Sequence, residues 1–137
     1  GIYGALAGAY GVPVLMGSGD DAFIEETRLL FPQAVYVQTK RATGQGSGIS
    51  LSPALACSAI RTGVAQAVQR RAACAPWQIE GPVQVEIQTQ TPALADLFCQ
   101  WPTLARVDGD LLQFTAPDTE SAVRMINCLS AMSSMLR

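Results

Sequence analysis

A short, continuous apolar segment near the start of the chain sets the strongest limit on its fold. Residues Val12–Met16 contain no polar side chain, and Gly11 and Gly17 bound them on either side. An uninterrupted apolar run of this length is typical of a strand that is covered on both faces, as in a parallel sheet. Pro13 suits the start of such a strand, where a missing N–H is tolerated. We therefore expect a buried strand at this position.

A helix and a second strand are predicted after this segment. We expect Gly17–Gly19 to form a turn, followed by a helix over residues 22–31. Asp20 and Asp21 would cap this helix, because carboxylates stabilise the positive end of a helix. Residues 34–39 (AVYVQT), which are mainly apolar and β-branched, predict the second strand. Strand, helix and strand in this order favour a right-handed βαβ unit.

Two further helices are predicted on either side of this unit. Residues 2–10 suit a helix whose Gly4 and Gly8 leave one face bare, so that another backbone could approach it closely. The Ser52-Pro53 pair is a typical helix start, and we expect this helix to run to Cys74. Its predicted buried stripe consists of small and apolar residues, namely Leu55, Ala59, Ile60, Gly63, Val64 and Ala67.

The pattern changes in the second half of the chain. Residues 83–88 alternate strictly between apolar and polar side chains, which predicts a strand with one buried face and one solvent-exposed face. We then expect a helix from Thr91-Pro92 to Trp101, a hairpin with an Asp108-Gly109 turn, and a closing helix behind a capping box over Thr115–Asp118. The predicted fold class is therefore α/β, a βαβ (parallel-sheet) segment followed by an antiparallel α+β (β-α-β-β-α) segment, as part of a larger fold.

Composition narrows the partners that the chain can have. The net charge is −2, with nine basic and eleven acidic residues and no basic stripe, which disfavours nucleic acid as a partner. No apolar run approaches the ~20 residues of a membrane-spanning helix. The four cysteines follow no zinc or redox spacing, so we expect reduced, buried thiols in a cytoplasmic protein.

The sequence contains no complete catalytic set. It has no histidine, so no Ser–His or Cys–His pair can form within it, and the usual ligand of catalytic zinc is missing. We therefore assign no catalytic residue and no metal ligand to this chain. Gly17-x-Gly19-x-x-Ala22 loosely matches a dinucleotide fingerprint, but Asp20 and Asp21 stand where a pyrophosphate would lie. A nucleotide-binding α/β domain is therefore a minor alternative.

Substrate-pocket candidates gather around a predicted glycine-rich loop, residues 40–51. The loop follows the carboxyl end of the second strand, where open α/β sheets place their ligands. Its backbone N–H groups could meet an anionic or carbonyl oxygen, and Lys40 adds a positive charge at its base. The candidates are Lys40, Ser47, Ser50 and Asp20, the last of which ends the neighbouring strand. The alternatives are a flexible connection, a structural ion pair for Lys40 and helix capping for Asp20.

Several short stretches, taken together, resemble one family. They are Ala7-Gly8-x-Tyr10-Gly11-Val12-Pro13-Val14-Leu15, Gly19-Asp20-Asp21, Glu25-Glu26, Lys40, and Ile49-Ser50-Leu51-Ser52-Pro53. Their order and spacing are similar to those of the D-aminopeptidase family of metallopeptidases, first associated with dipeptide-transport operons. The second half of the chain resembles this family more loosely.

The resemblance implies a zinc-dependent aminopeptidase that releases N-terminal amino acids, D-amino acids in characterised members, from short peptides. Family proteins are about twice as long as this chain, so it corresponds to their C-terminal half. Their metal-binding carboxylates and histidines precede the segment that begins here at Gly1, and none has a counterpart in this sequence. The implied zinc therefore belongs to the full-length enzyme, and we expect none to be bound by this chain alone.

The resemblance also implies an assignment for the two segments and for their partners. Residues 1–75 would be the C-terminal portion of the metallopeptidase domain, and residues 76–137 an α+β subdomain. The expected partners are a short peptide substrate, the missing N-terminal half and further copies in a homo-oligomer. A metal-free binding or assembly module with the same fold is the main alternative. The coding region upstream of Gly1 would separate the two.

Overall fold

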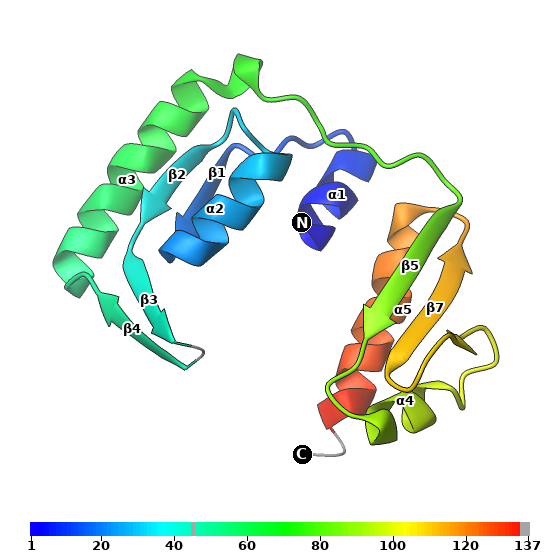
Figure 1. Ribbon diagram of the computed structural model, residues 1–137. Coiled ribbons are helices and arrows are strands. Elements are labelled where there is room, and N and C mark those ends of the chain that lie inside the picture. The colour runs from blue at the N-terminus through cyan, green and yellow to red at the C-terminus, as the bar shows by residue number, and fades with distance from the viewer. Residues whose placement is uncertain (45, 135–137) are drawn as a thin grey trace. The chain divides into compact units, whose positions relative to one another are not determined.

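The computed structural model describes residues 1–44 and 46–134. The chain divides into two compact units, the first made of Gly1 and Tyr3–Gln78 and the second beginning at Ile79. Most elements of both units are labelled in Figure 1.

The first unit is built around a βαβ arrangement. Strand β1 (Met16–Gly19), helix α2 (Asp21–Leu30) and strand β2 (Val35–Gln38) follow one another, and the two strands pair in parallel. Asp20 is the N-cap of α2, and its carboxylate accepts a hydrogen bond of 2.8 Å from the Phe23 N–H. The predicted βαβ unit and its acidic cap are therefore confirmed.

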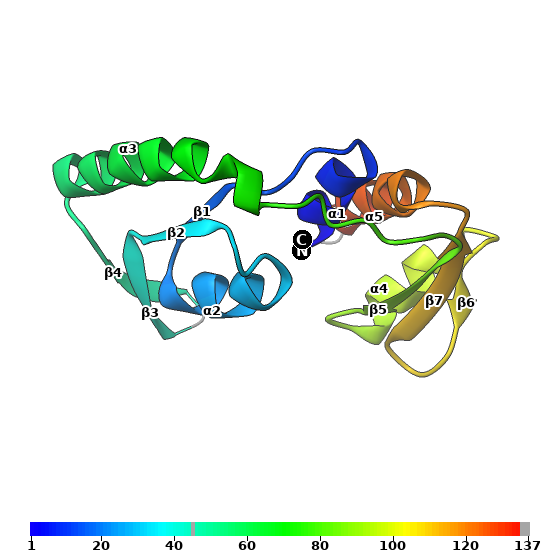
Figure 2. The ribbon, with the colours of Figure 1, turned by 90° about the horizontal axis from the view of Figure 1, so that it is seen from above.

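Helices cover both faces of this two-stranded sheet. Helix α3 (Pro53–Gln69) lies on the face opposite α2, as Figure 2 shows. A Cβ added at Gly63 of α3 would stand 2.4 Å from Cγ2 of Val37. On the other face, the rings of Phe23 and Tyr36 occupy the space that side chains at the β1 glycines would need. The absence of side chains at these glycines thus lets both helices pack closely on the sheet.

Helix α1 (Ile2–Ala9) has the close backbone approach that its glycine spacing predicts. A Cβ at Gly8 would stand only 1.9 Å from the carbonyl oxygen of Trp77, and Gly8 is buried. Gly11 follows the helix with φ +73°, a conformation that L side chains rarely adopt. Both observations confirm the predicted helix and its stop.

Several expectations for the first unit are wrong. The segment Val12–Met16 is not a buried strand, because Val12 is 54% exposed, the other four residues are half-buried, and pairing starts only at Met16. Gly17–Gly19 belong to β1 instead of forming a turn. Residues 40–51 form a hairpin rather than an irregular loop, with strands β3 (Lys40–Gly44) and β4 (Ser47–Ser50). Helix α3 ends at Gln69, followed by a 3₁₀ turn (Arg71–Ala73), and Leu55 and Val64 on its predicted stripe are 61% and 47% exposed.

The second unit is a three-stranded antiparallel sheet with two helices. Its elements are β5 (Val83–Gln88), α4 (Pro92–Phe98), β6 (Ala105–Arg106), β7 (Leu111–Ala116) and α5 (Thr119–Ser133), and the strand order is β5-β7-β6. Side chains from both helices and from β7 form its core, including Phe98, Leu112 and Leu129. The inner face of β5 packs against this core, while Gln84, Glu86 and Gln88 are exposed. The predicted fold class is confirmed.

Two local predictions in the second unit need correction. Helix α4 ends at Phe98, short of Trp101. The N-cap of α5 is Asp118, which accepts a hydrogen bond from the Ser121 N–H, whereas Thr115 belongs to β7. This bond also holds the pKa of the Asp118 carboxyl below its usual value.

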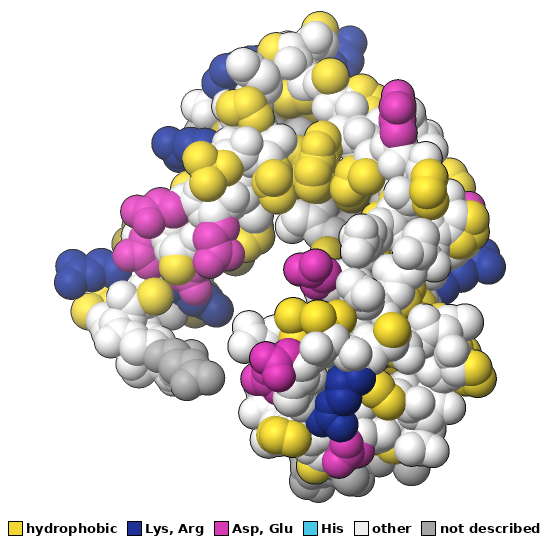
Figure 3. All heavy atoms as spheres, turned by 45° about the vertical axis from the view of Figure 1, so that its right-hand side comes forward, with side chains coloured by type: hydrophobic (Ala, Val, Ile, Leu, Met, Phe, Trp, Pro, Cys, Tyr) yellow, Lys and Arg dark blue, Asp and Glu magenta, His cyan; other side chains and the backbone are white. Residues whose placement is uncertain are grey.

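The cysteines are less buried than the sequence predicts. All four cysteines are free thiols, but Cys57 and Cys128 are exposed and Cys74 and Cys99 are half-buried, so the expectation of buried thiols is wrong. On the face shown in Figure 3, the Lys and Arg side chains are scattered among acidic and apolar ones. Among the described residues, no helix is long and apolar enough to cross a membrane.

Candidate functional site

The parallel strands β1 and β2 bring their carboxyl ends together at one edge of the sheet. β1 ends at Gly19 and β2 at Gln38, which are register partners, and the Thr39 N–H donates to the Gly19 carbonyl at 2.9 Å. The N-terminus of α2 and the β3–β4 hairpin both begin at this edge. In open α/β sheets this is the edge where ligands bind. All four pocket candidates from the sequence lie near it or on the hairpin.

Lys40 and Ser50 lie directly opposite each other at the base of the hairpin. They are register partners in the antiparallel pair, so their side chains project from the same face of the hairpin. Their Cβ atoms are therefore about 4.5–5.5 Å apart. Both residues are exposed. The ion pairs of the described residues involve Arg106 and Arg124, not Lys40. An ammonium group and a hydroxyl are thus available together for an anionic or carbonyl oxygen.

Ser47 is not brought together with these two residues. Side chains alternate along a strand, which places Ser47 on the face opposite Ser50. Its hydroxyl shares a hydrogen bond of 3.0 Å with that of Thr43, beside a register shift between Ala42 and Gly44. The structure therefore gives Ser47 a local partner within the hairpin.

Asp20 and Asp21 have different partners. One oxygen of Asp20 accepts the capping bond from the Phe23 N–H. Asp21 accepts a hydrogen bond of 2.7 Å from the Ala42 N–H, which belongs to the hairpin. This bond is the main cause that holds the pKa of the Asp21 carboxyl below its usual value, with a smaller contribution from the charge of Arg41. The sequence analysis missed this contact, because it read Asp21 only as part of a helix cap.

The residues of this chain do not fit a catalytic zinc ion. The sequence has no histidine. Within residues 1–44 and 46–134, no group of three or more Cys, Asp or Glu side chains is placed to hold a metal ion. Since catalytic zinc sites use three protein ligands, nothing described here supplies such a site.

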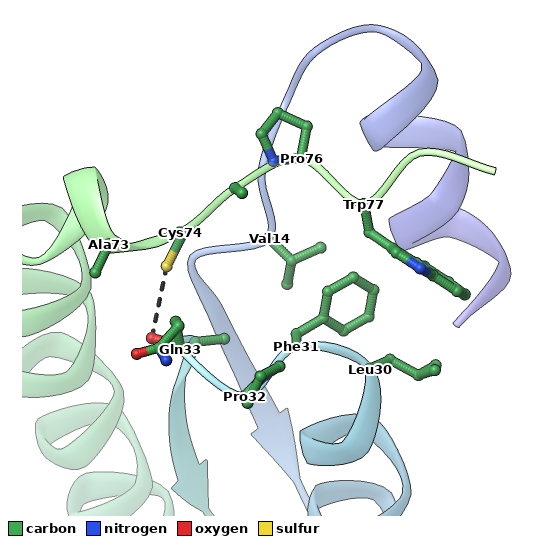
Figure 4. A pocket seen from close by; sticks show the side chains of 11 residues that line it. Val14, Leu30, Phe31, Pro32, Gln33, Ala73, Cys74, Pro76 and Trp77 are labelled. Carbon is green, nitrogen blue, oxygen red and sulfur yellow. Dashed lines mark hydrogen bonds between the residues drawn. The ribbon is translucent and has the colours of Figure 1, made fainter. Parts of the chain in front are cut away.

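A separate apolar hollow of about 250 Å³ lies in the first unit (Figure 4). Trp77 lines it and stands edge-on to Phe31 with ring centroids 5.5 Å apart. The Cys74 thiol faces the hollow and donates to the Gln33 carbonyl at 3.5 Å. No charged side chain lines it. The hollow could accept apolar groups, but its lining residues offer no carboxylate or imidazole for hydrolysis.

The dinucleotide-like pattern of the sequence has a structural explanation. Gly17 and Gly19 lie within β1, and a Cβ at Gly19 would stand 2.7 Å from Cδ1 of Phe23. The glycines therefore make room for aromatic rings. In a dinucleotide-binding domain, by contrast, the glycines of the fingerprint make room for the pyrophosphate of the cofactor.

Comparison with solved structures identifies a similar protein. The chain is similar to the Zn-dependent D-aminopeptidase DppA from Bacillus subtilis, described as a self-compartmentalizing protease, with a TM-score of 0.88. The sequence identity is 24%, so this likeness establishes the fold. The match covers 95% of this chain and 48% of that protein, so the chain spans about half the length of its neighbour.

The sequence was also compared with curated protein sequences and with protein-family models. No curated protein sequence matches the chain. The sequence model of the D-aminopeptidase family, Peptidase_M55, matches residues 1–128. Because this match spans nearly the whole sequence, the chain belongs to the D-aminopeptidase family, as the short stretches in its first half predict.

Proposed function

We propose that this chain forms the substrate-facing part of a zinc-dependent aminopeptidase that removes N-terminal amino acids, D-amino acids among them, from short peptides. The observation that carries the proposal is the D-aminopeptidase family match over residues 1–128. The Zn-dependence of the structural neighbour supports zinc as the metal. Because the described residues hold no fitting ligand set, we propose that the zinc ligands come from an N-terminal half outside residues 1–137.

The hairpin supplies the substrate contacts in this proposal. A short peptide carries carbonyl oxygens and a terminal carboxylate, and the exposed Lys40 ammonium is the complementary group. Ser50, opposite Lys40, adds a hydroxyl that can donate a hydrogen bond. Asp20 caps α2 through one oxygen, so its second oxygen remains a candidate for the substrate ammonium group. Ser47 takes a secondary place, because it lies on the other face with Thr43.

The assembly and location of the protein are part of the same proposal. We propose a homo-oligomer, since the structural neighbour is described as self-compartmentalizing, and a cytoplasmic location, since all four cysteines are free thiols. Large apolar side chains of the first unit are exposed on the hairpin and on α3, which fits a surface that other polypeptide covers. They are Ile49, Leu51, Leu55, Val64 and Val68.

One observation favours a second candidate function. The described residues hold no metal-binding group, which would suit a metal-free binding or assembly module of the same fold. Such a module would bind peptide without hydrolysing it. The kinetic experiment below separates the two, because only an enzyme yields product.

The test is a Lys40→Ala substitution in the zinc-loaded enzyme that contains this chain. Loss of one charged contact costs roughly 1.5–3 kcal/mol, so we expect kcat/KM for a short peptide to fall about 10- to 100-fold. Zinc content and Tm should stay unchanged. Arg41→Ala is the matched control, because Arg41 is the adjacent cation on the opposite face of the hairpin. Unchanged kinetics in Lys40→Ala, or an equal loss in Arg41→Ala, would remove Lys40 from the site.

A further inference from the structure

The β3–β4 hairpin has few contacts that fix its orientation relative to the βαβ unit. Every described residue of both strands is exposed, so no apolar core holds the hairpin in place. Strands β3 and β4 pair only with each other among the described residues. A two-stranded hairpin of this kind is at best marginally stable in water. The groups that anchor the hairpin to the βαβ unit therefore decide where Lys40 and Ser50 stand.

One anchor reaches the hairpin from a distant part of the sequence. The Asp21 carboxylate, at the first turn of α2, accepts the 2.7 Å hydrogen bond from the Ala42 N–H, 21 positions along the chain. Other hydrogen bonds hold only the base of the hairpin, such as the bond from the Gln38 side chain to the Lys40 carbonyl at 3.0 Å and the bond from the Leu51 N–H to the Thr39 carbonyl at 2.9 Å. Asp21 thus links the rigid helix start to β3, two residues beyond Lys40.

The chemistry of this link suits a positioning role. A carboxylate that accepts from a backbone N–H forms a charge-assisted bond, which is stronger than a bond between neutral groups. The bond from Ala42 lowers the pKa of the Asp21 carboxyl, which means that it favours the ionised form of the group. The N-terminus of α2 also favours a negative charge at this position.

We infer that Asp21 is a positioning residue, which holds the hairpin so that Lys40 and Ser50 stay at the substrate edge of the sheet. This inference rests on the proposed function of the hairpin. Asp21 acts through Lys40 and Ser50, and its own carboxylate is engaged with Ala42. Removal of Asp21 should therefore loosen the hairpin and weaken the contacts that Lys40 makes.

The first arm of the test measures the hairpin itself. Hydrogen–deuterium exchange of residues 40–50 is compared in the parent enzyme, Asp21→Ala, Asp21→Asn and Glu25→Ala. We expect at least several-fold faster exchange in Asp21→Ala and a smaller change in Asp21→Asn, which keeps an acceptor oxygen. Glu25→Ala removes a carboxylate from the exposed face of the same helix and should leave the hairpin unchanged. Unchanged hairpin exchange in Asp21→Ala would overturn the inference.

The second arm measures catalysis through a double-mutant cycle. We expect Asp21→Ala to lower kcat/KM about tenfold, with partial recovery in Asp21→Asn. The double variant Asp21→Ala/Lys40→Ala should lose less than the sum of the two single losses, because part of the effect of the anchor passes through Lys40. Additive losses, or unchanged kcat/KM in Asp21→Ala, would overturn the positioning role. If Lys40→Ala alone has no effect, the proposed role of Lys40 fails, and the exchange arm still decides whether Asp21 anchors the hairpin.

Discussion

Replacement of Gly63 by alanine tests how helix α3 is held on the sheet. Alanine favours a helix by about 1 kcal/mol over glycine, so propensity alone predicts a more stable protein. The new Cβ, however, would stand 2.4 Å from Cγ2 of Val37 and 3.2 Å from Cε of Met16. Real Cβ atoms are essentially never found closer than 3.0 Å to another heavy atom. Val37 is β-branched and cannot swing away easily, so α3 has to move off the sheet.

The two effects oppose each other, and their sizes decide the outcome. Overpacking of a close helix–sheet contact costs up to about 3 kcal/mol, which leaves a net loss of up to about 2 kcal/mol in the free energy of unfolding. The double variant Gly63→Ala/Val37→Ala removes the clashing atoms. It should therefore be less destabilised than the sum of the two single variants, by about 1–2 kcal/mol.

Urea unfolding followed by Trp77 fluorescence measures this directly. Trp77 lies in the first unit and packs against Phe31, so it reports on that unit when the measurements are made in a Trp101→Phe background. Gly46→Ala is the control, because nothing lies within 4 Å of a Cβ at that position. A Gly63→Ala protein as stable as its parent, or more stable, would refute the close packing of α3 on β2.

Two further predictions concern the core of the second unit and the hairpin anchor. Leu112→Ala should lower the free energy of unfolding by about 2–5 kcal/mol, because Leu112 is fully buried. Leu29→Ala, the same change at a residue that is 85% exposed, should cost less than about 0.5 kcal/mol, and equal costs in urea unfolding would contradict the assigned core. Because the folded-state pKa of Asp21 is lowered, its bond to Ala42 stabilises the protein above the unfolded pKa of about 3.9 and is lost as pH falls through the folded value. An NMR titration of the Asp21 carboxyl should give a midpoint below about 3.9, and a midpoint at or above that value would contradict the anchor.

Local signals in the sequence were sufficient for the fold class. Asp20 precedes a helical stripe and Ser52 precedes proline, and both are N-caps in the structure. The alternation in residues 83–88 predicted a half-exposed strand, which is what β5 is. These features depend on neighbours within a few residues, so sequence patterns can reveal them.

The errors arose where distant residues decide the local structure. Gly17–Gly19 resemble a turn by composition, but the rings of Phe23 and Tyr36 fill the space beside them and the segment pairs as a strand. The hairpin has no alternation of apolar and polar residues, because both of its faces are exposed. The contact from Asp21 to Ala42 spans 21 positions, and no local pattern marks it.

The central claim is that this chain provides the substrate-facing part of an aminopeptidase whose zinc ligands lie in a separate N-terminal half. The most direct test measures zinc content and D-aminopeptidase activity of the isolated 137-residue chain after dialysis against trace zinc. The account predicts neither retained zinc nor release of an N-terminal D-amino acid from a short peptide. Stoichiometric zinc together with hydrolysis by this chain alone would contradict it.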